Sequence, residues 1–268
     1  MYQSKVNIKS KKNILKKNLW KAILAFLILF IASCSKIDMS DSKAQTEAID
    51  VENERLKSLH DAGIEEEKID ISYSDDGFMP LNIKYPRLTS DDATIQKALD
   101  IVNEDLKTSA ERFKKENVEL EVTEEEKASR DEYGFSLDNT DVTLTNFSDK
   151  YFSLIDFSYV DYMGAHPTYF IGGYIFDRKS GKELKIFDLI KDKEELRDYL
   201  KKWVKENDED GAFFDDFAED SINNYVDGNI DLECYVENDE IYVIFQIYDI
   251  APYAVGAIHV NIPKELLR

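Results

Sequence analysis

The stretch Tyr162-Met163-Gly164-Ala165-His166-Pro167 contains the only His-Pro step of the chain and separates two strand patterns rich in aromatic residues. Before it, residues 150–160 alternate between two faces that are both mostly apolar, which is typical of a central strand. After it, residues 169–176 form another strand pattern, in which Gly172 and Gly173 indicate a bulge or a close approach of a second backbone. We therefore expect a tight turn near the centre of the folded part.

The sequence upstream of this turn predicts short strands and one long helix. Residues 69–73 and 81–86 alternate apolar and polar side chains, and Pro86 is expected to end the second strand because it lacks a backbone donor. A helix is expected to start near Asp92, which is spaced with Thr89 as in a capping box. Its core-facing stripe is predicted to contain Ile95, Leu99, Val102, Leu106, Ala110 and Phe113.

The sequence downstream predicts a hairpin, two helices and a meander. Residues 184–187 are expected to pair with the strand at 169–176. Asp192 begins a helix with a capping pattern, and another helix covers 214–225. Strands are expected at 230–236, 240–248 and 254–262, with a turn at Glu237-Asn238-Asp239 between the first two. The patterns together predict an α+β fold with antiparallel sheets and packed helices, in two lobes at residues 69–161 and 162–268.

The N-terminal segment is basic and then apolar. Seven lysines and no acidic residue precede an unbroken apolar run at residues 22–31, which describes a signal peptide over residues 1–33. The run is shorter than the roughly 20 residues that a membrane-spanning helix needs. Residues 34–68 are rich in Ser, Asp, Glu and Lys, so they are predicted to form a flexible acidic tether.

Ile31-Ala32-Ser33-Cys34 resembles a bacterial lipobox, in which the cysteine is acylated and becomes the first residue after cleavage. The resemblance implies a lipoprotein that is anchored in a membrane through lipid at Cys34, with the remaining chain outside the cytoplasm. Ser35 rather than Asp follows the cysteine, which by the same resemblance implies the outer membrane or the cell surface. The alternatives are an ordinary cleavage site or an uncleaved anchor with an incidental cysteine.

The net charge of the chain limits the classes of partner that it is expected to bind. The formal charge is −21, and it becomes −28 without the seven lysines of the N-terminal segment. An acidic body repels phosphate backbones, so we expect no nucleic acid partner. A cationic partner is favoured, such as a basic protein, a cationic peptide or metal ions, although solubility alone also explains such a charge.

Several spaced motifs resemble a bacterial extracytoplasmic domain pair. The motifs are Ile83 to Pro86, Gly164 to Pro167, Asp177 to Leu184, Phe187 to Ile190, and Tyr248 to Gly256. This family includes the extracellular part of a lysozyme-sensing anti-sigma factor and domains that precede a peptidoglycan deacetylase. The resemblance implies a lysozyme-sensor type of domain over residues 162–268 and a deacetylase-associated type over residues 69–161.

The resemblance implies binding rather than catalysis. The N-terminal segment is too short and too basic for a sigma-binding region, Met163 replaces a glycine of the fuller motif, and no deacetylase pattern is present. We therefore expect a non-catalytic envelope lipoprotein that binds a protein or wall-related ligand, with lysozyme, a basic protein, as the implied candidate. The alternatives are an envelope enzyme that acts on wall glycan and a structural lipoprotein without a soluble ligand.

The candidate binding residues are His166, Pro167, Pro252 and Tyr253. His166 with Asp156 or Asp161 could form a metal site or a base with its orienting acid, but a histidine before proline in a glycine turn more often fixes the loop. The corner at Pro252 and Tyr253 could expose an aromatic anchor for a partner, or serve only as a turn.

Other chemistry is not supported by the sequence. The acidic stretch at 206–211 lacks the closing glutamate of a calcium loop, since Phe217 stands in its place. Ser153, Ser158 and Ser221 lack the glycine context of a hydrolase nucleophile, and Cys234 is expected to be a buried apolar residue. We therefore predict no catalytic residue, no metal site and no cofactor.

Overall fold

The computed structural model describes residues 42–73, 80–117, 135–162, 166–208, 211–213 and 215–268. The chain divides into two compact units, Met1–Asp61 and Ala62–Arg268. The expected signal peptide at residues 1–33 and the expected lipidation site at Cys34 lie outside the described residues. None of the helices in the described part is long and apolar enough to cross a membrane.

The first unit contains helix α2 at Ser42–Asp61, where the sequence predicts part of a flexible tether. The helix has no glycine or proline, and its Glu, Lys and Ala residues favour helix formation. Arg55 also pairs with Glu52 one turn earlier through two contacts, Nε–Oε2 at 2.8 Å and Nη2–Oε1 at 2.9 Å. The flexible tether that the acidic composition predicts is therefore a helix at residues 42–61.

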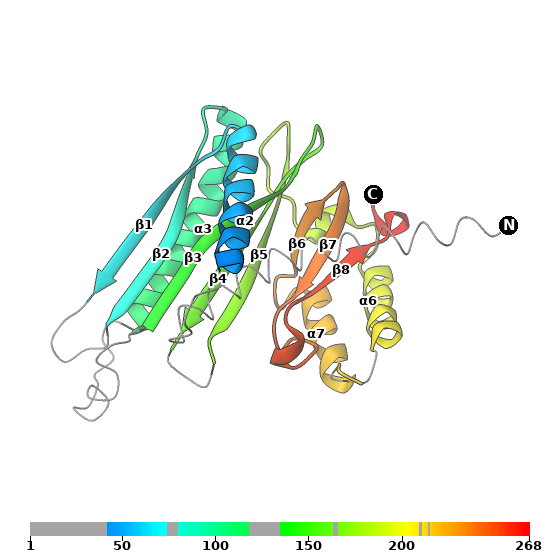
Figure 1. Cartoon of the computed structure of the whole chain (residues 1–268). Helices are drawn as coiled ribbons and strands as arrows, with labels where there is room; N and C mark the ends of the chain where they lie inside the picture. The colour runs from blue at the N-terminus through cyan, green and yellow to red at the C-terminus, as the bar shows by residue number, and fades with distance from the viewer. Residues whose placement is uncertain (1–41, 74–79, 118–134, 163–165, 209–210, 214) are drawn as a thin grey trace, which may run out of the picture. The chain divides into compact units, whose positions relative to one another are not determined.

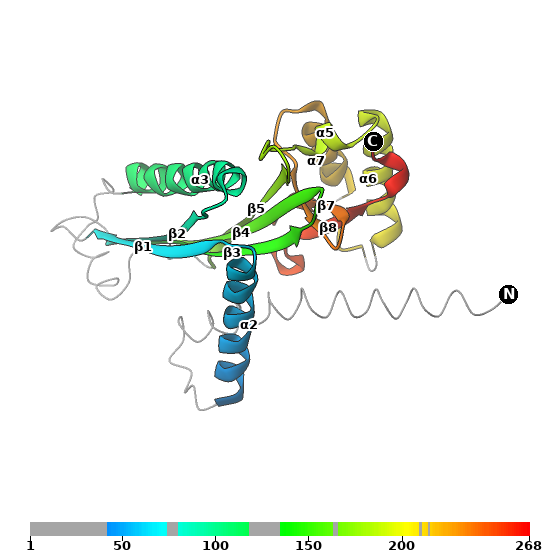
Figure 2. The same cartoon turned by 90° about the horizontal axis from the view of Figure 1, so that it is seen from above.

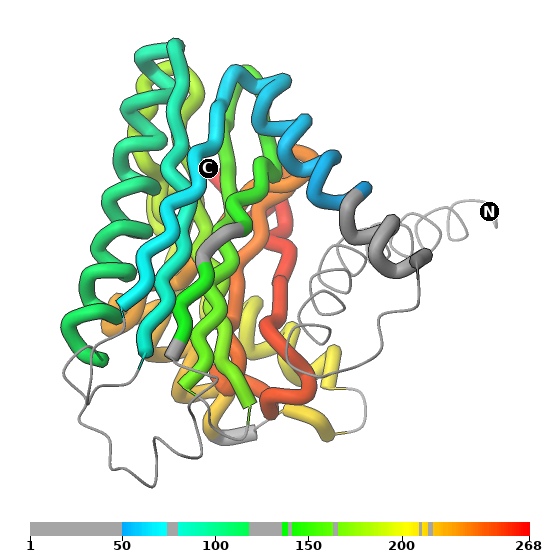
Figure 3. Tube along the Cα trace, turned by 60° about the vertical axis from the view of Figure 1, so that its left-hand side comes forward, coloured from blue at the N-terminus to red at the C-terminus, as the bar shows by residue number. Residues whose placement is uncertain are grey.

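The second unit begins with a five-stranded sheet in the order β1-β2-β3-β4-β5 (Figure 1). Its strands are β1 (Glu65–Tyr73), β2 (Leu81–Thr89), β3 (Phe135–Phe147), β4 (Tyr151–Asp161) and β5 (Thr168–Asp177). The tube trace shows these strands side by side (Figure 3). All neighbouring pairs in this sheet are antiparallel except β2 and β3, which are parallel.

Helix α3 (Ala93–Asn117) explains that parallel pair, because it returns the chain to the starting end of the sheet. Asp92 caps its first turn by accepting from the N–H groups of Thr94 (2.8 Å) and Ile95 (3.1 Å). All six residues of the predicted stripe are buried. Asn103 pairs with both backbone groups of Leu88 at 2.8 Å, which fixes α3 on one face of the sheet (Figure 2).

The strand limits at β1 and β2 differ from those expected. Strand β1 begins at Glu65 rather than Ile69, because its charged first residues pair with the end of β2. Strand β2 continues through Pro86, which the sequence predicts as its end. Pro86 lies beyond Lys84, the last residue of β2 that pairs with β3, so its missing N–H breaks no ladder on that side.

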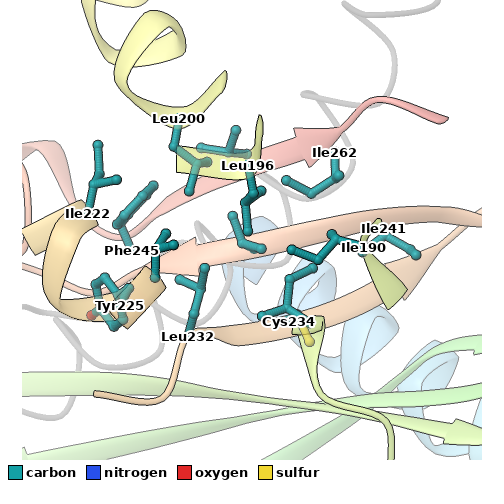
Figure 4. Packing of buried hydrophobic residues seen from close by; sticks show 14 of the residues in the cluster. Ile190, Leu196, Leu200, Ile222, Tyr225, Leu232, Cys234, Ile241, Phe245 and Ile262 are labelled. Atoms are coloured by element: carbon teal, nitrogen blue, oxygen red, sulfur yellow. The ribbon is translucent and has the colours of Figure 1, made fainter. Parts of the chain in front are cut away.

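The remaining elements form a second layer around a three-stranded antiparallel sheet in the order β6-β7-β8. They are α5 (Ile186–Leu189), α6 (Lys193–Asn207), α7 (Asp215–Asp227), β6 (Glu233–Glu237), β7 (Glu240–Phe245), η1 (Tyr253–Val255), β8 (Ile258–Ile262) and η2 (Lys264–Leu266). As predicted, Asp192 caps α6, and the hairpin turns at Asn238 and Asp239. Apolar side chains of α6 and α7 pack on one face of this sheet (Figure 4).

The α+β fold class is confirmed, but further predicted details differ. Strand β7 ends at Phe245 and β8 begins at Ile258, so both are shorter than expected. Residues 184–187 form no strand. An isolated bridge joins Phe176 to Glu183, Leu184 N–H donates to Ile175 O, and α5 begins at Ile186. The expected lobe boundary between residues 161 and 162 falls inside the hairpin of β4 and β5. Strand β5 therefore belongs to the first sheet, because its ten residues pair with β4.

The two sheets meet at β5, as the Gly172-Gly173 pair indicates. A Cβ at Gly172 would lie 1.9 Å from Asp156 Oδ1, and a Cβ at Gly173 would lie 2.5 Å from the Cys234 carbonyl oxygen on β6. Ser153 supports the same junction, since its Oγ accepts from Val236 N–H at 2.9 Å and donates to the Tyr174 carbonyl at 2.8 Å. The predicted close backbone approach is therefore present at Gly173.

Two side chains, at the start of β6 and just after β7, and one backbone group before α5 cover the outer edge of β5. The Gln246 amide accepts from Ile171 N–H and donates to Ile171 O, both at 3.0 Å. Glu233 Oε2 accepts from Gly173 N–H at 2.8 Å, and Leu184 N–H donates to Ile175 O at 2.7 Å. Edge groups that would otherwise need water or another strand are thus bonded within the unit.

We predict that Gly173→Ala destabilises the protein by about 1–3 kcal/mol, because the added methyl group collides with the β6 backbone. Urea unfolding followed by circular dichroism measures the change. Thr168→Ala on the exposed start of β5 is the matched control and should change stability by less than about 0.5 kcal/mol. Equal stability of Gly173→Ala and the parent would contradict the close approach.

Gln246→Leu should cost about 1–3 kcal/mol, because it keeps the side-chain volume but leaves both backbone groups of Ile171 without their partner. Gln246→Glu keeps the acceptor and loses the donor, so we expect a smaller loss. Hydrogen exchange of the Ile171 amide should accelerate in the Leu variant. Unchanged exchange there would show that Gln246 does not cap this edge in solution.

Candidate functional site

Four aromatic side chains gather where the chain enters β5 and where it passes from β7 to β8. We call His166, Tyr169, Tyr248 and Tyr253 the aromatic corner. The His166 ring stacks on Tyr253 with centroids 4.1 Å apart and planes 28° apart. Tyr253 also lies 5.9 Å from Tyr248 and 6.3 Å from Tyr169, centroid to centroid. The structure thus joins two segments separated by about eighty residues in the sequence into one ring cluster.

Two hydrogen bonds orient the His166 ring. Nδ1 lies 3.0 Å from the Pro167 carbonyl oxygen, and Nε2 lies 3.2 Å from the Tyr248 hydroxyl. Because a carbonyl oxygen can only accept, Nδ1 is the donor to Pro167, while Nε2 and the Tyr248 hydroxyl form the second hydrogen bond. The ring is therefore oriented by two partners, as the structural interpretation of a histidine in this turn predicts.

The loop after β7 is held by contacts from β5 and α7. Asp249 is the anchor: its carboxylate accepts from Gln246 N–H and from the Tyr225 hydroxyl, and its carbonyl accepts from Ser221 Oγ at 2.7 Å. Burial raises the pKa of Asp249, while these two donors oppose the rise. Ile250 is fully buried in the core behind the loop. The loop is thus a rigid support for the rings.

Tyr248 adopts a backbone conformation that is unusual for its type. Its φ is 67°, in the left-handed region, where a bulky residue is strained. Its side chain is nevertheless 46% exposed, so burial of the ring does not explain the strain. Strained residues that the surrounding structure holds in place occur most often at functional sites. Tyr248 is therefore a candidate contact residue.

Tyr169 connects the corner to the core. Its ring stacks on Phe157 of β4 with centroids 5.2 Å apart, and its hydroxyl accepts from Ala257 N–H at 3.0 Å. Gly256 permits this contact, since it has a φ of 80° and a Cβ there would lie 3.0 Å from the Tyr169 oxygen. The other rings of the corner therefore rest on a half-buried pair, Tyr169 and Phe157.

Of the four binding residues expected from the sequence, His166 and Tyr253 are in direct contact. Pro167 supplies the carbonyl that His166 binds, and exposed Pro252 precedes the η1 turn that carries Tyr253. Sequence reasoning did not single out Tyr169 and Tyr248. Tyr248 lay inside the family-like motif that ends at Gly256, but its role depends on a backbone angle that no local pattern reveals.

Asp156, one of the two acids that the sequence suggests as a partner of His166, is occupied with other neighbours. Asp156 is buried beneath Gly172, where it accepts from Ser158 Oγ at 3.1 Å, and burial raises its pKa to about 6. No group of three or more His, Cys, Asp or Glu residues that could hold a metal ion is found in the described ranges. The structure thus gives no support, among these residues, for a metal site at His166.

The serines considered as nucleophiles form hydrogen bonds that support the fold. Ser153 bridges the two sheets, Ser158 donates to Asp156, and Ser221 donates to the loop anchor Asp249. Cys234 is buried, as expected, and burial raises the pKa of its thiol to about 12, which disfavours the reactive thiolate. Asp208 accepts from Phe213 N–H at 2.9 Å and thereby fixes the loop before α7.

Comparisons with known proteins agree with this fold. Residues 183–265 match the model of a family described as "Protein of unknown function (DUF3298)". A DUF3298 family member from Bacteroides fragilis NCTC 9343 has 18% sequence identity and a TM-score of 0.51, over 76% of this chain and 94% of its own. A DUF3298 family protein from Pseudomonas aeruginosa PAO1 has 16% identity and a TM-score of 0.46, over 76% of this chain and 94% of its own. No curated protein matches this chain. The chain thus shares its fold with the Bacteroides protein, and its residues 183–265 form a DUF3298 domain, a domain of unknown function.

Proposed function

We propose that this protein is a non-catalytic lipoprotein of the cell envelope that binds another protein through the aromatic corner. The observation that carries the proposal is the strained and exposed Tyr248 beside the His166–Tyr253 stack. Two contacts from β5 and α7, at Gln246 and Asp249, hold this arrangement in place. Rigid aromatic side chains lose little conformational entropy on binding, and they are frequent anchors of protein interfaces.

The chemistry of the corner favours a neutral or cationic contact. The segments 162–172 and 246–257 contain no lysine or arginine, and the chain after the expected signal peptide is strongly acidic. Tyrosine faces attract cations, and an acidic body steers a basic partner toward it. A basic protein such as lysozyme fits this description, and the family resemblance of the sequence supports the same candidate.

The lipobox-like stretch supports the location. Lipid at Cys34 would hold the chain at the outer membrane or the cell surface, where wall-active proteins are present. We predict that cells expressing the full chain incorporate radioactive palmitate into the protein, and that Cys34→Ser removes the label because the acylated thiol is lost. Fractionation should move the variant out of the membrane pellet. Labelling that persists in Cys34→Ser would contradict the assignment.

Tyr248→Asn tests the corner, since asparagine tolerates the left-handed conformation but removes the ring. We expect it to weaken binding to a basic lysozyme at least about tenfold, as loss of an interface anchor does. Tyr162→Asn is the matched control, because Tyr162 is 44% exposed and lies outside the corner. It should leave the affinity within about threefold, which is the scale of a near-neutral surface change.

Titrations with the purified full chain in detergent, at low and high salt, measure these affinities. Attraction between an acidic body and a basic partner should weaken as salt screens the charges. Absence of binding at low salt would remove lysozyme as the partner. Equal losses in Tyr248→Asn and Tyr162→Asn would remove the corner as the contact surface.

A further inference from the structure

Strand β5 passes between two carboxyl groups at the point where the sheets meet. Asp156 on β4 lies so close to Gly172 that no side chain fits there, and Glu233 on β6 accepts from Gly173 N–H at 2.8 Å. Consecutive residues of one strand thus contact one acid from each sheet. Asp156 is buried and Glu233 is partly buried, so both carboxyls are removed from much of the solvent.

The surroundings of these two acids are poor in positive charge. The groups that act on them are Asp105 from α3, Ser158 from β4, Tyr174 from β5, Lys185 from the segment before α5, and Asp231 before β6. Lys185 is the cation among these described groups, and it also forms an ion pair with Glu183 at 2.5 Å. Glu183 in turn adds to the negative field at Asp105. One lysine cannot neutralise this cluster when both carboxyls are ionised.

We propose that Asp156 and Glu233 form a proton-operated latch at Gly172–Gly173, which holds the two sheets together while they are protonated and loosens when they ionise. The ionised carboxyls would place two like charges in a poorly solvated junction. Opening would let water reach both groups, at the cost of the Glu233 bond to Gly173 and the contacts around it.

Proton binding determines which form is favoured at acid pH and over which pH range the latch loosens. Burial is the main cause that raises the pKa of Asp156 from 3.8 to about 6 and that of Glu233 from 4.5 to about 7. A closed junction therefore binds protons more tightly than an open, solvated one. The closed form is favoured at acid pH, and this advantage is lost as the pH rises from about 4 to about 7.

Opening of the latch would affect residues beyond Asp156 and Glu233, because β5 connects the glycine pair to the aromatic corner. Ile171, which Gln246 caps, is next to Gly172, and Tyr169 lies two residues further back. Loosening of β5 would therefore reach the ring base of the corner. The latch itself does not depend on which ligand the corner binds.

Hydrogen exchange of the full chain in detergent, followed by mass spectrometry between pH 4.5 and pH 8, tests the latch. After correction for the intrinsic exchange rate, protection of a peptide covering residues 171–176 should fall at least about tenfold between pH 5 and pH 7. Glu233→Gln should make this dependence shallower, and Asp156→Asn with Glu233→Gln should remove it. Asp220→Asn, on an exposed position of α7, is the charge control and should behave as the parent.

Three results would overturn the latch. The first is constant protection of residues 171–176 in the parent over this pH range. The second is an unchanged pH dependence in the double variant or, where that variant does not fold, in Glu233→Gln. The third is an equal loss of protection in a peptide of α3, such as residues 99–110, because the whole unit would then unfold together rather than open at β5.

Discussion

The close approach of backbone to backbone at Gly173 is the constraint on which the second unit depends. Strand β5 has Asp156 against one of its glycines and the β6 backbone against the other, so neither position accepts a Cβ. The same approach lets Gln246 and Glu233 of the second sheet bond the edge of β5. An edge that would otherwise attract another chain becomes an internal joint between two sheets.

The aromatic corner is a consequence of this joint. Gln246 fixes the end of β7 to Ile171, and Asp249 then turns the chain so that Tyr248 takes its strained conformation beside His166. Tyr169 supports the rings through its half-buried stack with Phe157. The contacts of the joint thus hold the rings of the corner in fixed positions. A purely structural corner would bury such rings, whereas Tyr248 remains half exposed.

Local patterns in the sequence predicted the features that depend on neighbouring residues. These include the buried stripe of α3, the Asp192 cap of α6, the turn at Asn238 and Asp239, and the close approach at the glycine pair. The start of α3 was predicted only approximately, because Asp92 itself caps the helix in place of Thr89. Features that depend on distant pairing were missed. The parallel pair of β2 and β3 follows from the path of α3, and the place of β5 in the first sheet follows from its full pairing with β4. The two halves of the corner were identified separately, but their contact is a tertiary event, and the backbone angle of Tyr248 leaves no mark in the sequence.

If the joint at β5 presents the aromatic corner to a protein partner, the bound partner must shield the rings of the corner. Hydroxyl-radical footprinting of the full chain, free and bound to a basic lysozyme, measures this shielding. Labelling of Tyr248, Tyr253 and His166 should fall on binding, while labelling of the equally exposed Tyr162 should not change. Protection of Tyr162, with Tyr248 and Tyr253 labelled as in the free protein, would place the partner on another surface and rule out the corner as the contact.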